Sequence, residues 1–344
     1  MNIKGKVLFY SGNGNHQLGA QILKQVTEYL GSTAKFSHTD FGEFPDGESD
    51  AQIPKYSNIN GKVVVFYQSV FSTELFEEAL ELIWAMKKQY GAKHVIAVFP
   101  FMIFRRQDHK ENMSEICRLR MAIDRLKHAG VDELITISPH SSKMAEFCEE
   151  FEIKMHEVDP STLFASTIDA YTSEVPVVYS PDRGSIPRAI ALAKLTNSKV
   201  IFSLKERGLN NDTKILPKEQ KQVEEIIKHY TEEGFTDIHY ADASRIKGQT
   251  IVMVEDEVST GGTANKTGQR LKQLKAKEII FLAVHPVFVS GWRRKLFDDE
   301  PFDKVIMGNT IPRDYGKQTG GLIHTVDTSG LLGKGLFKSL KPFI

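Results

Sequence analysis

The sequence predicts an α/β protein of two domains, each a mostly parallel sheet flanked by helices. The chain has 344 residues, and domains hold about 150 residues each, so two domains are expected. Short runs of β-branched and aromatic residues alternate with segments of helical period, the pattern of parallel strands joined by crossover helices. Hydrophobic residues make up 41% and charged residues 26% of the chain, which excludes the disordered and coiled-coil classes.

The strand and helix signals can be placed along the chain. The expected strands are residues 6–10, 62–67, 94–99, 133–137, 175–179, 199–202, 249–254 and 278–284. An amphipathic helix is expected where apolar residues recur at helical spacing, at Leu75, Ala79, Leu82, Ile83 and Met86. A second has its apolar face at Val223, Ile226, Ile227 and Tyr230, with Pro217 at its start.

The two halves of the chain share an order of short motifs. Ser-Thr, a helix, Ala-Lys and a strand ending in Pro occur at residues 72–100 and again at 259–286. This order indicates a duplicated α/β domain. We place the boundary where Pro and Ser interrupt the pattern, which gives domains of residues 1–159 and 160–344.

Charge and cysteine content exclude several classes of protein. Lys and Arg together number 44, as do Asp and Glu, so no net field favours nucleic acid or an anionic membrane as a partner. Cys117 and Cys148 are too few for a disulfide framework. No apolar run reaches the roughly 18 residues that span a bilayer, and the first residues lack a signal-peptide core. A cytoplasmic protein is expected.

The most informative stretch is a buried strand that leads into a Gly loop and a helix. The loop consists of Thr260, Gly261, Gly262 and Thr263, after Ser259. Glycines expose backbone N–H groups, the helix N-terminus adds partial positive charge, and the Thr hydroxyls are further donors, so the loop suits a phosphate monoester. Glu255 and Asp256 can bind ribose hydroxyls or Mg²⁺ at the carboxyl end of the sheet. The alternative is an ordinary strand, turn and helix with a capping Thr.

This stretch resembles the signature of type I phosphoribosyltransferases, and the chain from about Gly5 onward resembles the ribose-phosphate diphosphokinase, or phosphoribosyl pyrophosphate synthetase, family. The resemblance implies two phosphoribosyltransferase-type domains with the active site between them. It implies transfer of the β,γ-diphosphate of Mg-ATP to the anomeric hydroxyl of ribose 5-phosphate, which gives phosphoribosyl pyrophosphate and AMP. It also implies a homo-oligomer, a dimer or a hexamer of dimers, in which a neighbouring subunit contributes to the ATP site.

The resemblance assigns ATP contacts to two motifs in the first half. Phe44, Asp46 and Glu48 match a loop that contacts adenine. An aromatic ring can stack on an aminopurine, and carboxylates beside it can accept hydrogen bonds from the amino group. The second motif is Arg106, Gln107 and Asp108, in which the guanidinium would bind phosphate. Residues 109–120 match a mobile catalytic lid. Alone, the first motif would be an ordinary turn and the second a solvated loop.

Four further residues are assigned to the reacting phosphates. The resemblance places His140 beside the metal and the ATP phosphates, and Asp182 at Mg²⁺ or the ribose ring. Lys205 and Arg207 would stabilise the migrating diphosphoryl group. Without the resemblance, His140 would be a structural histidine and the two cations a solvated edge.

The chain departs from the family pattern at four positions. Ser138 and Ser259 each replace an Asp, Ser185 replaces a Gly, and Glu255 replaces the first Asp of the acidic pair. Three alternatives therefore stay open: the same transfer to a larger acceptor such as ADP-ribose, a phosphoribosyltransferase that consumes phosphoribosyl pyrophosphate, and a non-catalytic regulatory subunit of a synthetase.

Overall fold

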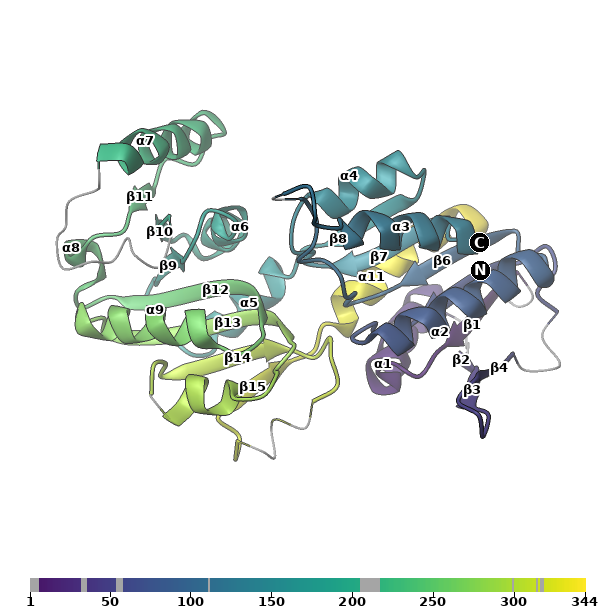
Figure 1. Ribbon diagram of the computed structural model, residues 1–344. Coiled ribbons are helices and arrows are strands. Elements are labelled where there is room, and N and C mark those ends of the chain that lie inside the picture. Colours follow the sequence, from purple (N-terminus) through teal and green to yellow (C-terminus); the bar gives the residue numbers. More distant parts are fainter. Residues whose placement is uncertain are drawn as a thin grey trace. The chain divides into compact units, whose positions relative to one another are not determined.

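A computed structural model describes residues 6–31, 36–53, 58–110, 112–204, 217–298, 300–313, 315 and 319–344. The chain divides into two units (Figure 1). The first comprises Met1–Asp159, Thr310–Pro312 and Asp327–Ile344, and the second Pro160–Asn309 and Arg313–Val326. No helix in these described ranges has the length and apolar character needed to cross a membrane.

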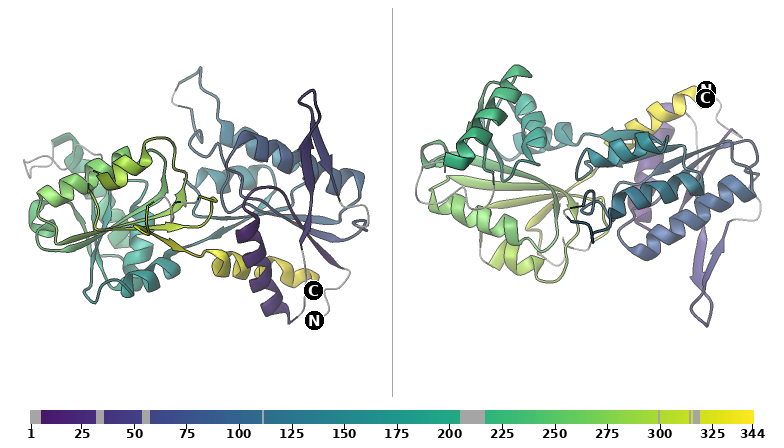
Figure 2. Two further views of the ribbon diagram at one scale, coloured as in Figure 1. Left: turned by 90° about the horizontal axis from the view of Figure 1, so that it is seen from below. Right: turned by 45° about the horizontal axis from the view of Figure 1, so that its top comes forward.

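The first unit is a six-stranded parallel sheet in the order β2-β1-β5-β6-β7-β8. Its strands are β1 (Val7–Ser11), β2 (Phe36–His38), β5 (Val63–Tyr67), β6 (His94–Val98), β7 (Glu133–Ile137) and β8 (Lys154–Val158). Helices α2 (Thr73–Trp84), α3 (Arg118–Ala129) and α4 (Lys143–Glu150) cover one face, with the π-turn η1 (Ala85–Gln89) extending α2. Helices α1 (His16–Leu30) and α11 (Ser329–Leu340) pack together on the other face, and the short η4 (Lys341–Phe343) follows α11. An antiparallel hairpin of β3 (Asp40–Glu43) and β4 (Ser49–Gln52) projects from the unit (Figure 2).

The second unit is a seven-stranded parallel sheet in the order β11-β10-β9-β12-β13-β14-β15. Its strands are β9 (Val177–Ser180), β10 (Lys199–Phe202), β11 (Ile238–Tyr240), β12 (Thr250–Val258), β13 (Glu278–Pro286), β14 (Lys304–Gly308) and β15 (Ile323–Val326). Helices α5 (Ser161–Asp169) and α6 (Ile186–Thr196) pack together, and α7 (Pro217–Glu232) contacts the edge strand β11. The remaining helices are α8 (Ala243–Ile246), α9 (Gly262–Gln273) and the π-turn η3 (Arg294–Asp298), which packs on α9.

The two sheets share one strand order, as the repeated motifs predict. Strands β2-β1-β5-β6-β7-β8 correspond in sequence order to β10-β9-β12-β13-β14-β15, with β11 added at one edge. Central strands are apolar throughout, and all five residues of β5 are buried, as expected of parallel strands covered on both faces. The predicted fold class is confirmed.

The structure differs from the expected domain ranges at the end of the chain. Residues 327–344 belong to the first unit, not to a continuous C-terminal domain of residues 160–344. Leu332, Leu336 and Leu340 form a buried stripe on α11. A Cβ at Gly333 would lie 2.6 Å from Gln25 Cβ of α1. The helix therefore docks closely on the first sheet's own helix layer.

Strand β12 is longer than the sequence predicts. It continues to Val258, pairing Glu257 with His285 and Val258 with Pro286 of β13. The acidic pair therefore lies within the strand and not after it. Because side chains alternate across a strand, Asp256 is buried while Glu255 and Glu257 are partly exposed.

Candidate functional site

The Gly loop after β12 has the geometry of an anion-binding turn. Gly261 is the N-cap of α9 and adopts a left-handed conformation with φ 74°. A Cβ there would lie 3.2 Å from Leu296 Cδ2, so this position requires glycine for both conformation and space. The side chains of Thr260 and Thr263 are exposed, and Gly262 N donates to Thr260 Oγ1 at 3.3 Å. The loop presents two hydroxyls and a helix N-terminus to a ligand.

Glu255 lies where the loop after β9 approaches β12. Ser185 Oγ donates to Glu255 Oε2 at 3.1 Å. Burial, reinforced by the negative charges of Asp182 and Asp256, raises the pKa of Glu255 to about 8. The raised pKa favours the protonated carboxyl, which can donate a hydrogen bond as well as accept one.

The loop of residues 181–185 is held in place by its own hydrogen bonds. Ser185 N donates to Asp182 Oδ1 at 2.9 Å, and Ser180 Oγ donates to the Asp182 carbonyl at 2.8 Å. The Asp182 side chain is exposed. Since β9 and β12 are neighbours in the sheet, the structure brings Asp182, Ser185 and Glu255 to one edge of it.

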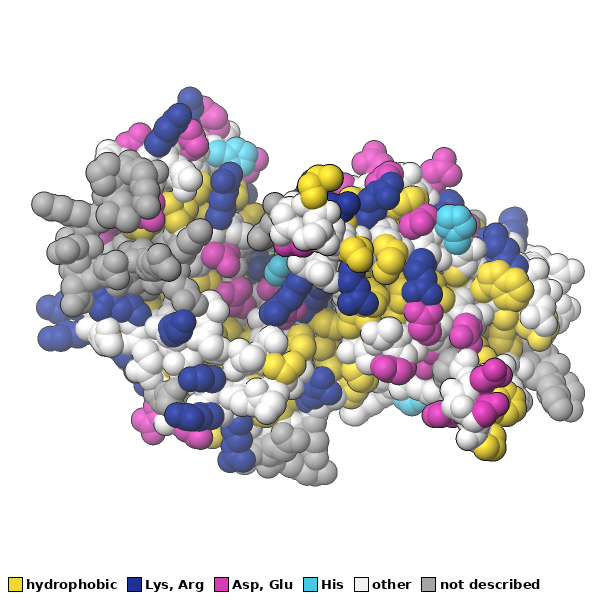
Figure 3. Space-filling view, in the orientation of Figure 1, with side chains coloured by type: hydrophobic (Ala, Val, Ile, Leu, Met, Phe, Trp, Pro, Cys, Tyr) yellow, Lys and Arg dark blue, Asp and Glu magenta, His cyan; other side chains and the backbone are white. Residues whose placement is uncertain are grey.

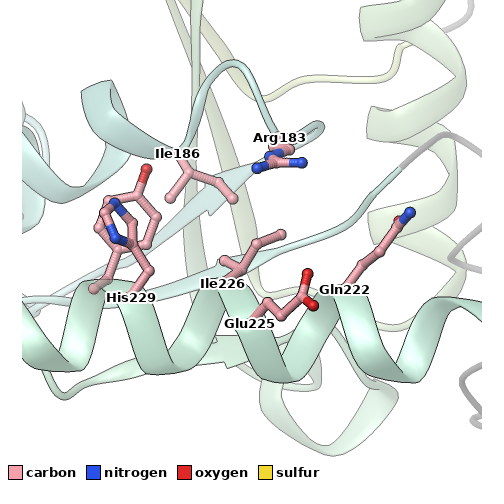
Figure 4. A pocket seen from close by; sticks show the side chains of 7 residues that line it. Arg183, Ile186, Gln222, Glu225, Ile226 and His229 are labelled. Atoms are coloured by element: carbon pink, nitrogen blue, oxygen red, sulfur yellow. The ribbon is translucent and has the colours of Figure 1, made fainter.

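A pocket of about 290 Å³ adjoins this loop. Arg183 and Ile186 lie on one side, and side chains of α7 lie on the other (Figure 4). Those from α7 are Gln222, Glu225, Ile226, His229 and Tyr230. The helical stripe in the sequence identified Ile226 and Tyr230 as apolar-face residues, but nothing in the sequence placed them beside the Asp182 loop.

The Arg-Gln-Asp motif of the first unit follows β6. Arg106 and Gln107 are exposed, whereas Asp108 is buried. Asp108 accepts from Ser141 Oγ at 2.5 Å and is 2.6 Å from His109 Nδ1. Burial raises the pKa of Asp108, but these hydrogen bonds outweigh it and leave the pKa below its ordinary value. Asp108 thus connects this loop to the segment after β7.

That segment carries the predicted His140. Its side chain is exposed just beyond β7. Ser138, which stands where the family pattern has Asp, is buried and left-handed, with φ 48°. A non-glycine residue in this conformation stores strain that functional sites commonly tolerate.

The predicted adenine loop is the turn of the β3–β4 hairpin. Gly47 has φ 92°, and Glu48 N donates to Asp46 Oδ1 at 3.2 Å. Phe44 is 49% exposed, so its ring has a face available to a ligand. Figure 2 shows this hairpin and the loop between β6 and α3 as two separate projections of the first unit.

Two predicted catalytic residues, Lys205 and Arg207, lie outside the described residues. Within the described ranges, no group of three or more His, Cys, Asp and Glu side chains could hold a metal by itself. Mg²⁺ commonly uses one or two carboxylates together with substrate phosphates. The exposed Asp182 carboxylate fits an ion that arrives with a nucleotide.

Two family models match consecutive parts of the chain. The N-terminal domain of ribose phosphate pyrophosphokinase matches residues 7–130, and the phosphoribosyl transferase domain matches residues 156–311. A ribose-phosphate pyrophosphokinase from Sulfurisphaera tokodaii is 29% identical over 80% of this chain and 85% of its own length. Another, from Ralstonia nicotianae, is 27% identical over 97% of this chain and 95% of its own length. The chain belongs to the ribose-phosphate pyrophosphokinase family.

A solved structure agrees with this assignment at the level of the fold. The crystal structure of phosphoribosylpyrophosphate synthetase from Mycobacterium smegmatis matches with a TM-score of 0.74 and 21% identity, and covers 97% of this chain and 98% of its own. As a ribose-phosphate pyrophosphokinase family member, the chain is an enzyme of the transferase class.

Proposed function

We propose that the chain transfers the β,γ-diphosphoryl group of ATP to the anomeric hydroxyl of ribose 5-phosphate, which gives phosphoribosyl pyrophosphate and AMP. The observation that carries this proposal is the acidic pair of β12 followed directly by the glycine turn at the N-terminus of α9. This arrangement offers hydroxyl-binding carboxyls and, a few residues later in the chain, a phosphate cradle.

In this proposal, the acceptor lies at the carboxyl edge of the second sheet. The loop of residues 260–263 binds the 5-phosphate, while Glu255 and Asp256 hold the ribose hydroxyls. The protonated form of Glu255 donates to a hydroxyl oxygen, which a second ionised carboxylate could not do. Ser185 orients Glu255 by the hydrogen bond at 3.1 Å.

The nucleotide uses the residues of the first unit. Phe44, Asp46 and Glu48 contact adenine. The chain forms a homo-oligomer in which a neighbouring subunit contributes to this ATP site. Arg106 and Gln107 contact the phosphates and the nucleotide, whereas the buried Asp108 holds their loop.

Mg²⁺ would be held by Asp182 and would neutralise phosphate charge, and His140 is assigned to the metal and the ATP phosphates. Lys205 and Arg207 stabilise the charge of the diphosphoryl group in transit. Most of the catalysis is therefore positioning and electrostatics.

The test is to supply Mg-ATP with and without ribose 5-phosphate and to identify the products by mass. AMP and phosphoribosyl pyrophosphate, formed only with the acceptor present, support the proposal. ADP as the stoichiometric product would identify an ordinary kinase. Binding of both ligands without turnover would favour the regulatory-subunit alternative.

A further inference from the structure

The segment between β13 and η3 is fastened to the phosphate loop. Phe288 N donates to the Val258 carbonyl at 2.9 Å, and Val289 N donates to the Ser259 carbonyl at 3.2 Å. From the other side, Asn265 Nδ2 of α9 donates to the Lys295 carbonyl at 2.6 Å. These bonds fix the segment of residues 288–295 against the loop.

The close approach at Gly261 shows which residues adjoin the loop. A Cβ at Gly261 would lie 3.2 Å from Leu296 Cδ2 and 3.4 Å from Lys295 Cβ. The positions before these in the segment are Arg293 and Arg294. Lys295 therefore adjoins the phosphate loop, and Arg293 and Arg294 precede it in the same fastened segment.

These cations have no protein partners among the residues that the structure describes. Arg293 and Arg294 are exposed, Lys295 is partly exposed, and none of the three side chains makes a hydrogen bond or ion pair there. By contrast, Lys277 and Lys304 of the same unit pair with Glu174 and Glu278. Figure 3 shows Lys and Arg side chains gathered on the face of the second unit that carries α9.

A fourth cation joins them from another part of the chain. Arg313 Nη2 donates to the Val287 carbonyl at 2.9 Å, which brings its guanidinium to the start of the segment. The Arg313 side chain is exposed, so its charge adds to the positive charge at the start of this segment.

This positive charge exceeds what a phosphate monoester needs. Backbone N–H groups and a helix N-terminus already suffice for one phosphate. In addition, Ser259 stands where the resembled family has a carboxylate, so the loop repels added negative charge less. The surplus fits an acceptor that carries a second anionic group joined to the first.

We propose that Arg293, Arg294 and Lys295 bind a second phosphoryl group, in an acceptor whose ribose 5-phosphate is joined by a diphosphate bond to another group. A nucleoside diphosphate ribose with a free anomeric hydroxyl is such a compound. This inference rests on the proposed function: the diphosphoryl transfer is the same, and the acceptor is extended from ribose 5-phosphate to its diphosphate-linked derivatives.

The bonds that form and break are those of the proposed reaction. The anomeric hydroxyl oxygen of the terminal ribose bonds to the β-phosphorus of ATP. The bond from that phosphorus to the α,β-bridging oxygen breaks, AMP leaves with this oxygen, and the hydroxyl proton passes to solvent. The diphosphate within the acceptor stays intact and serves only for binding.

The experiment compares the affinities of ADP-ribose and ribose 5-phosphate by calorimetry on the full chain with Mg²⁺. In Arg293→Ala/Arg294→Ala, we expect the loss of affinity for ADP-ribose to exceed that for ribose 5-phosphate by about 10-fold or more, as for lost charge-assisted hydrogen bonds. Arg293→Lys/Arg294→Lys keeps the charge and should recover part of the difference. Lys194→Ala/Lys247→Ala is the control. It removes two exposed charges that precede β10 and β12 in the chain, whereas the cationic segment follows the carboxyl end of β13.

Equal losses for both ligands, or no loss for ADP-ribose, would overturn the inference. The inference would also be overturned if added inorganic phosphate changed the affinity of the wild type for ribose 5-phosphate and this effect disappeared in Arg293→Ala/Arg294→Ala. The site would then bind a free anion. Thermal unfolding of each variant identifies a folding defect, in which case the Lys variants alone decide. Because binding is measured apart from turnover, absence of AMP would contradict the proposed function and leave the binding comparison interpretable.

Discussion

The hydroxyl of Ser185 donates a hydrogen bond to the carboxyl of Glu255, and this contact joins the loop after β9 to strand β12. Serine at position 185 replaces the glycine of the resembled pattern, and glutamate at position 255 replaces an aspartate. The longer side chain of Glu255 and the added hydroxyl of Ser185 are thus hydrogen-bonded to each other. We infer that the two departures compensate: together they keep a hydrogen-bonded carboxyl at the sugar site.

Glu255→Gln should make stability less dependent on pH. The folded pKa of Glu255 is about 8, above its ordinary 4.5, so the folded state favours the proton and stability falls as pH rises between these values. Glutamine carries no such penalty. We expect the thermal midpoint of the variant to rise relative to wild type between about pH 5 and about pH 8.5 in the absence of ligands. Parallel curves would show that Glu255 ionises normally.

Glu133 should stabilise the packing of the C-terminal helix. It is buried and lies 3.0 Å from His94 Nε2 and 2.7 Å from His156 Nε2, and Ser339 Oγ of α11 donates to it at 2.5 Å. Burial raises the pKa of Glu133, but these hydrogen bonds outweigh it and hold the pKa well below its ordinary value. Its contribution is therefore present above about pH 4.5 and is lost as pH falls.

Glu133→Gln should lower the free energy of unfolding at neutral pH by about 1–3 kcal/mol, because the charge-assisted bonds are lost. The matched control is Glu149→Gln, which removes an exposed carboxylate on α4. Denaturant unfolding measures both. Equal stability of the two variants would mean that Glu133 does not hold α11.

The sequence predicts an element correctly where its signal is local. Strands β7 and β10 have the predicted bounds, and α7 begins at the predicted Pro217, because apolar runs and a proline act locally. The sequence predicts that β12 ends at Val254, because carboxylates are uncommon within buried strands, although backbone pairing with β13 continues through the acidic residues.

Tertiary contacts explain what the sequence did not reveal. Helix α11 contains Gly330, Gly333 and Gly335, which disfavour a helix until close packing against α1 and β8 compensates. Similarly, the three cations at residues 293–295 suggest no function until Gly261 is found beside Lys295. The phosphate loop itself was recognisable because all its parts are adjacent in sequence.

Gly261→Ala should impair binding of the sugar phosphate specifically. The substitution strains a backbone with φ 74° and brings a methyl group to 3.2 Å from Leu296. Gly248→Ala is the control, because Gly248 has φ 73° and nothing within 4 Å. We expect Gly261→Ala alone to raise KM for ribose 5-phosphate, by about 10-fold or more. Similar KM values for the two variants would remove the loop from the acceptor site.

Lys205→Ala and Arg207→Ala should each lower kcat much more than they weaken ATP binding. Cations that act on charge developing in transit contribute about 100-fold when one donor is lost. Steady-state kinetics and nucleotide titration separate the two effects. An unchanged kcat with a raised KM would make these residues binding groups only.

Ser259→Asp separates the two classes of acceptor, because it restores the carboxylate of the resembled pattern beside the phosphate loop. With ribose 5-phosphate, the variant should keep or improve kcat/KM. With ADP-ribose, the added charge faces a second phosphoryl group held by Arg293 and Arg294, and like charges repel. We therefore expect the ratio of kcat/KM for ADP-ribose to that for ribose 5-phosphate to fall in the variant, with Ser259→Asn as the uncharged control. If both variants lower this ratio equally, steric obstruction and not charge sets the preference. If neither variant changes it, position 259 does not distinguish the acceptors.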